Sequence, residues 1–208
     1  MSNITQPPKI SYGIAIFRFN EEKKANEILI IKKKQSYDFI LYRQRHMKKS
    51  GFNINNMYKN EREQVFFSEK KHSKIQCPVP EIWEPPKGRK HADEDVMECA
   101  MRETMEETLI PKKSYEIISH KYFEYTKTDG LTYYFRYFIG VMRPGADSKL
   151  LIDLNNREQT MEVGDMRWVS MAALEYFIED KLCLLIKKMN KFIRNHRKKL
   201  RRWYRENK

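Results

Sequence analysis

The chain has 208 residues, of which 40% are hydrophobic and 33% are charged. This length fits one domain, with or without an insertion, and the hydrophobic fraction excludes a wholly disordered protein. Its 41 lysines and arginines exceed its 28 acidic residues, which gives a formal net charge of +13. This excess favours an anionic partner, either nucleic acid, a phosphorylated small molecule or an acidic membrane surface, with a basic surface that has no partner as the alternative.

The first third of the chain predicts a β-hairpin followed by an insertion. Two segments rich in β-branched and aromatic residues, 9–19 and 27–34, flank a polar turn at 20–26. The segment 36–80 has scattered apolar residues among many Tyr, Lys, Arg and Asn. We interpret it as a partly helical, basic inserted subdomain, because a structureless loop of that length is unusual inside a compact domain.

The remainder of the chain alternates between β-branched or aromatic runs, which predict strands, and runs with helical periodicity. Pro85–Pro86 are expected to stop one strand, and Ser170 is a candidate N-cap. The expected elements are a strand at 79–87, a helix at 94–109, strands at 115–126 and 131–142 around the turn 127–130, a strand at 162–169, a helix at 171–180 and a long basic helix at 182–204.

The sequence shows neither the pattern of a membrane or secreted protein nor that of a cysteine-based framework. No stretch approaches the roughly 20 apolar residues of a membrane span, and the first residues lack a signal-peptide pattern, so we expect no transmembrane segment and a cytosolic protein. The three cysteines are Cys77, Cys99 and Cys183, and none forms a C-x-x-C pair. A disulfide framework or a cysteine zinc site is therefore not expected.

Three glutamates in the predicted helix 94–109 have the spacing of a metal-binding face. Glu103, Glu106 and Glu107 lie at i, i+3 and i+4, which puts their carboxylates on one side of a helix. Like charges at this spacing repel each other, and a divalent cation such as Mg²⁺ or Mn²⁺ would offset the repulsion. An ordinary solvated acidic face is the alternative for this triplet alone.

The residues around the triplet resemble a longer motif. Gly88, Glu94, Arg102-Glu103 and Glu106-Glu107 follow the spacing of the Nudix box, here at 88–110. The chain is similar to that family except at Thr104 and Leu109, where the family has an apolar residue and a glycine. The resemblance implies an α/β class fold, a Nudix α/β/α sandwich with a mixed sheet, formed as a single domain over 1–208.

The resemblance also implies roles for the residues of the box. Glu103, Glu106, Glu107 and the carbonyl of Gly88 would hold Mg²⁺ or Mn²⁺, and Glu94 would pair with Arg102. The implied reaction is hydrolysis of a nucleoside diphosphate linked to another moiety, in which metal ions neutralise phosphate charge and activate water and a carboxylate acts as base.

The lead-in Trp83-Glu-Pro-Pro-Lys-Gly88 resembles that of decapping and diphosphoinositol-polyphosphate Nudix hydrolases. Most of the chain outside 36–80 looks similar to the Nudix decapping family of African swine fever virus and giant viruses. This likeness implies a viral enzyme that removes the 5′ cap of mRNA in the host cytoplasm, releasing 7-methyl-GDP and 5′-monophosphate RNA, and so promotes mRNA decay and host shutoff. Diphosphoinositol polyphosphate hydrolysis and a non-catalytic RNA-binding module are the alternatives, and protein partners remain unknown.

Further site residues follow from the decapping resemblance. Glu162 precedes Trp168 by six residues, a spacing that implies a catalytic role beside Glu103 and Glu107, with Glu158 as second choice and a strand-edge acid as the alternative.

The stretch 187–208 carries 11 Lys and Arg with interleaved aromatics and predicts RNA binding, or else a solvated face. The aromatic residues that hold the cap guanine cannot be chosen from the sequence. The candidate RNA contacts are Lys87, Arg43, Arg45, Lys191, Arg194, Lys198, Arg201, Arg202 and Trp203.

Overall fold

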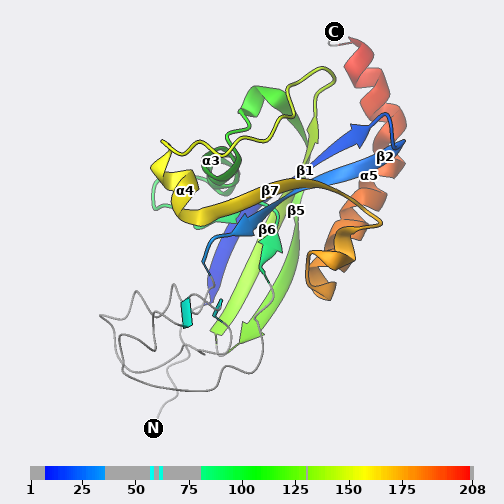
Figure 1. Cartoon of the computed structure of the whole chain (residues 1–208). Helices are drawn as coiled ribbons and strands as arrows, with labels where there is room; N and C mark the ends of the chain where they lie inside the picture. Colours follow the sequence, from blue (N-terminus) through cyan, green and yellow to red (C-terminus); the bar gives the residue numbers. More distant parts are fainter. Residues whose placement is uncertain (1–7, 36–56, 59–60, 63–80, 130, 207–208) are drawn as a thin grey trace.

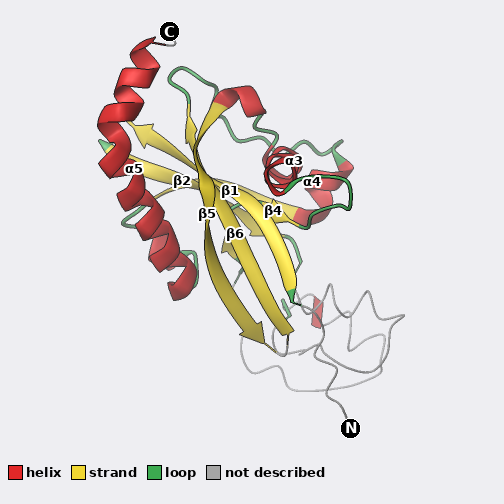
Figure 2. Ribbon diagram, turned by 180° about the vertical axis from the view of Figure 1, so that it is seen from behind, coloured by secondary structure: helices red, strands yellow, loops and turns green. Residues whose placement is uncertain are grey.

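The computed structural model describes residues 8–35, 57–58, 61–62, 81–129 and 131–206. A mixed β-sheet lies between helix α5 (Asp180–Glu206) on one side and helices α3 (Val96–Thr108) and α4 (Arg157–Glu162) on the other (Figures 1 and 2). The expected α/β class, with a mixed sheet between helical layers, is confirmed.

The sheet is built around a parallel pair of central strands. β1 and β6 run parallel over nine register positions, and the other strand pairs are antiparallel. The path is β3-β2-β1-β6-β5, with β4 paired to β1 and β7 paired to β2. The strands are β1 (Lys9–Asn20), β2 (Ala25–Lys33), β3 (Trp83–Glu84), β4 (Lys87–Gly88), β5 (Tyr115–Asp129), β6 (Leu131–Met142) and β7 (Val163–Ser170).

Side-chain alternation in the central strands builds two hydrophobic cores. In β1, Ala15 and Phe17 face the cluster that includes Leu182 and Ile186 of α5. Ile14 and Ile16 point the other way, into the cluster that includes Cys99 and Ala100 of α3. Because both sheet faces are covered here, the central parts of β1 and β2 are continuous buried runs rather than alternating ones.

The structure differs from the expected elements at three places. The strand at 79–87 is two short strands, β3 and β4, because Pro85–Pro86 offer no N–H to a ladder. The helix at 171–180 is wrong: a turn and the 3₁₀ helix η3 (Leu174–Tyr176) occupy it, since the apolar pattern of a single turn does not distinguish these conformations. Helix α4 was not expected, because only one of its side chains, Gln159, is buried.

The two ends of the inserted segment meet at one point of the sheet. The amide of Lys33 donates to the carbonyl of Ile82 at 2.9 Å. The hydroxyl of Tyr58 donates to the carbonyl of Lys33 at 3.1 Å and accepts from the amide of Ile82 at 3.0 Å. Tyr58 therefore fixes both ends of the insertion, most of which lies outside the described residues, as does Gly130 of the expected turn.

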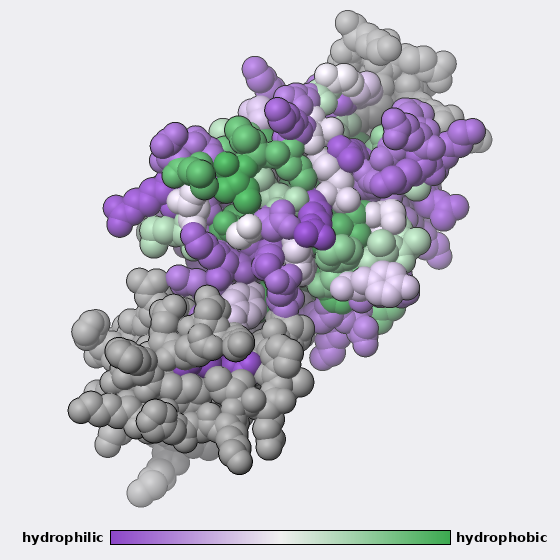
Figure 3. All heavy atoms as spheres, in the orientation of Figure 1, coloured by the Kyte–Doolittle hydropathy of each residue, from purple (hydrophilic) through white to green (hydrophobic). Residues whose placement is uncertain are grey.

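The surface drawn in Figure 3 combines charged areas with apolar ones. Leu151, Leu154 and Met161 are exposed in α4 and the segment before it, where Figure 3 shows hydrophobic atoms gathered on this face. No helix within the described part of the chain is long and apolar enough to cross a membrane.

Candidate active site

Helix α3 begins with a capping box that fixes its start. The Asp95 carboxylate accepts from the amides of Met97 and Glu98, and the Glu98 carboxylate accepts from the amide of Asp95. Both exchanges satisfy helix-start N–H groups. With the start fixed, Glu103 and Glu107 fall on the buried face of α3, towards β4, while Glu106 is more exposed.

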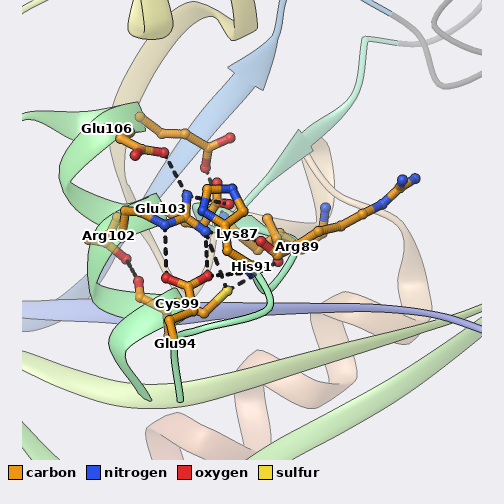
Figure 4. A network of polar contacts seen from close by, with 12 residues as sticks. Lys87, Arg89, His91, Glu94, Cys99, Arg102, Glu103 and Glu106 are labelled. Carbon is orange, nitrogen blue, oxygen red and sulfur yellow. Dashed lines mark hydrogen bonds and ion pairs between the residues drawn. The ribbon is translucent and has the colours of Figure 1, made fainter. Parts of the chain in front are cut away.

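Arg102 joins three glutamates of the Nudix box, Glu94, Glu103 and Glu106 (Figure 4). Its guanidinium donates twice to Glu94, at 3.0 and 2.7 Å, and once each to Glu103 at 2.8 Å and Glu106 at 2.9 Å. It also donates to the carbonyl of Arg89 at 3.0 Å, which holds the loop against the helix. The expected contact between Glu94 and Arg102 is present, and it holds the pKa of Glu94 at about 2.

Gly88 is required by the position of Glu103. A Cβ atom on Gly88 would overlap the carboxyl carbon and both carboxylate oxygens of Glu103. The Glu103 carboxylate therefore lies directly on the β4 backbone, and burial raises its pKa despite the neighbouring Arg102. Two of the four predicted metal ligands are thus brought into contact.

Glu107 is the most deeply buried carboxylate of the box. One of its oxygens accepts from the backbone amide of Lys87 at 2.8 Å, and the other pairs with the ammonium of Lys33. Burial raises the pKa of Glu107 to about 7, although Lys33 opposes the shift. Burial alone would lower the pKa of Lys33, but Glu107, Glu84 and Glu162 outweigh it and raise that pKa.

The candidate catalytic residue Glu162 also lies at this site. Its carboxylate accepts from Lys33 at 3.2 Å, so Lys33 bridges Glu162 and Glu107. The side chain of Glu162 is 60% exposed. The sequence predicted that Glu162 begins a strand, but in the structure it is the last residue of α4. The second choice, Glu158, is exposed in the first turn of α4.

Lys87 does not occupy an RNA-facing position, contrary to expectation. It is buried, its ammonium donates to Glu84 at 2.7 Å, and it lies 4.5 Å from the centre of the Phe135 ring. Burial lowers its pKa, against the attraction of Glu84. A buried, paired ammonium cannot contact an RNA phosphate without breaking this ion pair.

The other candidate RNA contacts are distributed between α5 and the insertion. Lys191 and Arg194 are exposed on α5, whose C-terminal end extends past the sheet (Figure 1). Lys198, Arg201, Arg202 and Trp203 belong to the helical backbone of α5. Arg43 and Arg45 lie outside the described residues.

The carboxylates of the box fit a hard divalent cation in their chemistry. Within the described ranges no group of three His, Cys, Asp or Glu side chains is arranged as a ready metal site. Arg102 draws Glu103 and Glu106 towards itself, and Lys33 pairs with Glu107. Oxygen donors gathered around the Gly88 backbone are nevertheless the ligand type that Mg²⁺ and Mn²⁺ take, so Glu103, Glu106 and Glu107 remain the predicted ligands.

Three polar residues of this region were not identified from the sequence. Lys33 and Glu84 are buried charges, and the buried Gln159 donates from its amide to the carbonyl of Glu107 at 3.2 Å. Lys33 ends a strand next to two other lysines, so only the strand register singles it out. Gln159 lies in a segment without an apolar pattern, so nothing in the sequence indicated that its side chain is buried.

Leu109 ends α3 where the Nudix box has glycine. It adopts the left-handed conformation, with φ 58° and ψ 13°, and its amide donates to the carbonyl of Met105. Glycine reaches this conformation without steric cost, which explains the family pattern. The substitution therefore strains the helix exit but leaves the carboxylates of the box in place.

Solved structures similar to this one share its fold at low sequence identity. A Caenorhabditis elegans Ap4A hydrolase in a binary complex is 16% identical with a TM-score of 0.58, over 90% of this chain and 98% of that one. The MutT protein of Methanosarcina mazei Go1 is 14% identical with a TM-score of 0.51, over 91% and 97%. At these identities the likeness concerns the fold alone.

Sequence comparison adds viral relatives and a family. The mRNA-decapping protein g5R of African swine fever virus, isolate Warthog/Namibia/Wart80/1980, is 29% identical over 97 residues, which are 46% of this chain and 39% of g5R. The isolate Pig/Kenya/KEN-50/1950 protein is 31% identical over 101 residues, with the same coverage. The aligned region thus spans well under half of these relatives. The NUDIX domain matches residues 49–192, more than half of the sequence, a range that includes Gly88, Glu103, Glu106 and Glu107. The chain therefore belongs to the NUDIX family of hydrolases.

Proposed function

We propose that this NUDIX protein hydrolyses the 5′ cap of RNA and releases 7-methyl-GDP and 5′-monophosphate RNA. The observation that carries the proposal is the site itself: buried box carboxylates lie against the Gly88 backbone in a chain similar to the mRNA-decapping protein g5R. The net charge of +13 favours a polyanionic substrate such as RNA.

The residues of the chain divide the work of such a reaction. Glu103, Glu106 and Glu107 would hold Mg²⁺ or Mn²⁺, which when bound neutralises phosphate charge and favours ionisation of water. Arg102 keeps the carboxylates of Glu103 and Glu106 at fixed positions on one side of α3. Glu162 is the most exposed of the described carboxylates at the site, and Lys33 positions it, so it is our candidate general base.

The exposed cations of α5 are the proposed contacts to the RNA backbone. Lys188, Lys191 and Arg194 are all exposed on α5, while Met189 and Ile193 are buried on its inner face. Each phosphate contact made by such a cation would add about −0.7 to the log–log salt slope for a single strand. Neutralising Lys191 and Arg194 together is expected to reduce that slope by about 1.4, whereas the control pair Lys112 and Lys113, exposed in η2 (Lys112–Ser114), leaves it unchanged.

A second candidate substrate is a diphosphoinositol polyphosphate. The same carboxylate site and the same positive charge suit a compact, highly anionic molecule. This reaction would need no RNA body, so neutralising Lys191 and Arg194 would affect decapping far more than inositide hydrolysis. A non-catalytic RNA-binding role is the remaining alternative, and action in the host cytoplasm with loss of host mRNA is part of the decapping proposal.

The test incubates cap-labelled RNA with the protein and Mg²⁺ or Mn²⁺, beside Glu107→Gln, and identifies the labelled product. We expect 7-methyl-GDP from the parent and none from the variant. No release with either metal would reject decapping. Hydrolysis of a diphosphoinositol polyphosphate in that case would support the second substrate, and full binding of RNA without any turnover would support the binding role.

A further inference from the structure

A row of register partners crosses the sheet from the active site to its edge. Gly88 of β4 pairs with Tyr12 of β1, Tyr12 with Arg136 of β6, and Arg136 with Glu124 of β5. Tyr12 belongs to the core beneath α3, so the row lies on the α3 face of the sheet. Neighbouring strands are about 4.8 Å apart, so the Arg136 backbone lies roughly 10 Å from Gly88.

Arg136 lies among tyrosine rings on this row. Its guanidinium carbon is 4.7 Å from the ring centre of Tyr122, 5.7 Å from that of Tyr12 and 6.0 Å from that of Tyr134. Nε donates to Glu124 at 2.6 Å and Nη1 to the Tyr12 hydroxyl at 3.1 Å, which fixes the plane of the group. The guanidinium is thus a rigid, flat cation rather than a mobile surface charge.

The site is accessible to a ligand within the described part of the molecule. Tyr122 is 43% exposed, and the side chain of Arg136 is 23% exposed. Among the described residues Nη2 of Arg136 has no hydrogen-bond acceptor, so its two N–H groups remain for a ligand. Flat aromatic and guanidinium groups of this kind stack nucleobases in single-stranded RNA.

We propose that Tyr122 and Arg136 form a stacking site for a neutral base of the RNA body, next to the carboxylate site. The proposal rests on RNA as the substrate. A 7-methylguanine base carries a positive charge and would be repelled by the Arg136 cation, whereas the uncharged bases of the RNA body would not. The face opposite α5 thereby gains a contact to bases, separate from the phosphate contacts proposed for α5.

The test measures binding of a short single-stranded RNA to the full chain by fluorescence anisotropy, with a chelator present so that no turnover occurs. Tyr122→Ala is expected to weaken binding about 5- to 150-fold, the usual effect of removing one stacking ring. Tyr122→Phe keeps the ring and is expected to bind like the parent. Tyr176→Ala removes an 82% exposed tyrosine elsewhere and serves as the matched control, with no effect expected.

RNA made with abasic nucleotides separates stacking from other causes. The parent is expected to bind abasic RNA as weakly as Tyr122→Ala binds intact RNA. Tyr122→Ala is expected to bind abasic RNA no more weakly than the parent does. An equal loss on abasic RNA would overturn the proposal, because the ring would then not be stacking on a base. An effect seen only with capped RNA would also overturn it, since the base would be the cap guanine.

The cap-hydrolysis assay is run on the same parent preparation, so the two ideas fail separately. A base-dependent loss in Tyr122→Ala together with no 7-methyl-GDP release would reject decapping and keep the stacking site. Release of 7-methyl-GDP with no base-dependent loss would keep decapping and reject the stacking site. Melting curves of Tyr122→Ala check that losing its contact with Phe138, 6.1 Å between ring centres, leaves the protein folded.

Discussion

Replacing Lys33 with methionine tests how the site tolerates its buried charges. The side chains of Lys33 and Glu107 are 10% and 3% exposed, and they pair with each other. After Lys33→Met the Glu107 carboxylate keeps the amide of Lys87 as its hydrogen-bond donor but loses its ion pair. Leaving such a charge without its partner costs about 3–5 kcal/mol, a large part of the roughly 5–15 kcal/mol that stabilises a typical protein.

The cost is expected to depend on pH in a definite direction. Lys33 holds the pKa of Glu107 at about 7 against the effect of burial, so its loss raises that pKa further. At pH 8 the carboxylate of the parent is mostly ionised, and removing Lys33 loses the full ion pair. At pH 5 the carboxyl is protonated in both proteins, so the difference in stability between Lys33→Met and the parent is expected to be smaller.

Urea unfolding of four proteins measures the coupling at pH 8 with a chelator present. They are the parent, Lys33→Met, Glu107→Gln and the double variant. We expect the double variant to lose less free energy of unfolding than the two single variants lose together, by at least about 2 kcal/mol, because it leaves no buried charge without its partner. Equal m-values are required for the comparison. Additive losses within about 0.5 kcal/mol would refute the argument that the ion pair dominates.

Three shorter predictions follow from other contacts. Gly88→Ala is expected to displace the Glu103 carboxylate and abolish turnover with the far-UV spectrum retained, while Gly164→Ala, where a Cβ meets only ordinary contacts, keeps both. Leu109→Gly is expected to relieve about 1 kcal/mol of left-handed strain and raise the melting temperature by about 2–4 °C; a decrease would contradict this. The pKa of Glu94 is lowered to about 2, so it stabilises the fold above the unfolded pKa and loses this contribution as pH falls towards 2; urea midpoints of Glu94→Gln and the parent are expected to converge between pH 6 and pH 2, and a constant gap would count against the pair with Arg102.

The elements with strong patterns were predictable from the sequence. The hairpin of β1 and β2 and the helices α3 and α5 follow from apolar runs and periodicity that local physics already determines. The segment 171–180 was not, because one turn of apolar spacing suits a 3₁₀ turn as well as a helix. Helix α4 buries Gln159 alone, so it had no apolar stripe from which to be found.

The site was predictable only where it is local in sequence. The spacing of Glu103, Glu106 and Glu107 determines their shared face on α3, and their roles remain predictions. Lys33 reaches Glu107 from a strand 74 residues earlier, a distance across which no spacing rule operates. The prediction of Lys87 as an RNA contact was wrong, because the pairing of Lys87 with Gly13 directs its side chain into the interior.

Tyr58 has a consequence for how the inserted region can vary between related proteins. Its hydroxyl holds both Lys33 and Ile82, so the chain on either side of Tyr58 leaves and rejoins the sheet at one shared anchor. The segments before and after Tyr58 are then two separate loops, and the length of one can change without altering the other. Doubling the length of either loop would cost only about 0.6 kcal/mol of loop-closure entropy. The inserted region can therefore change in length and charge while helix α3 and its carboxylates keep their positions.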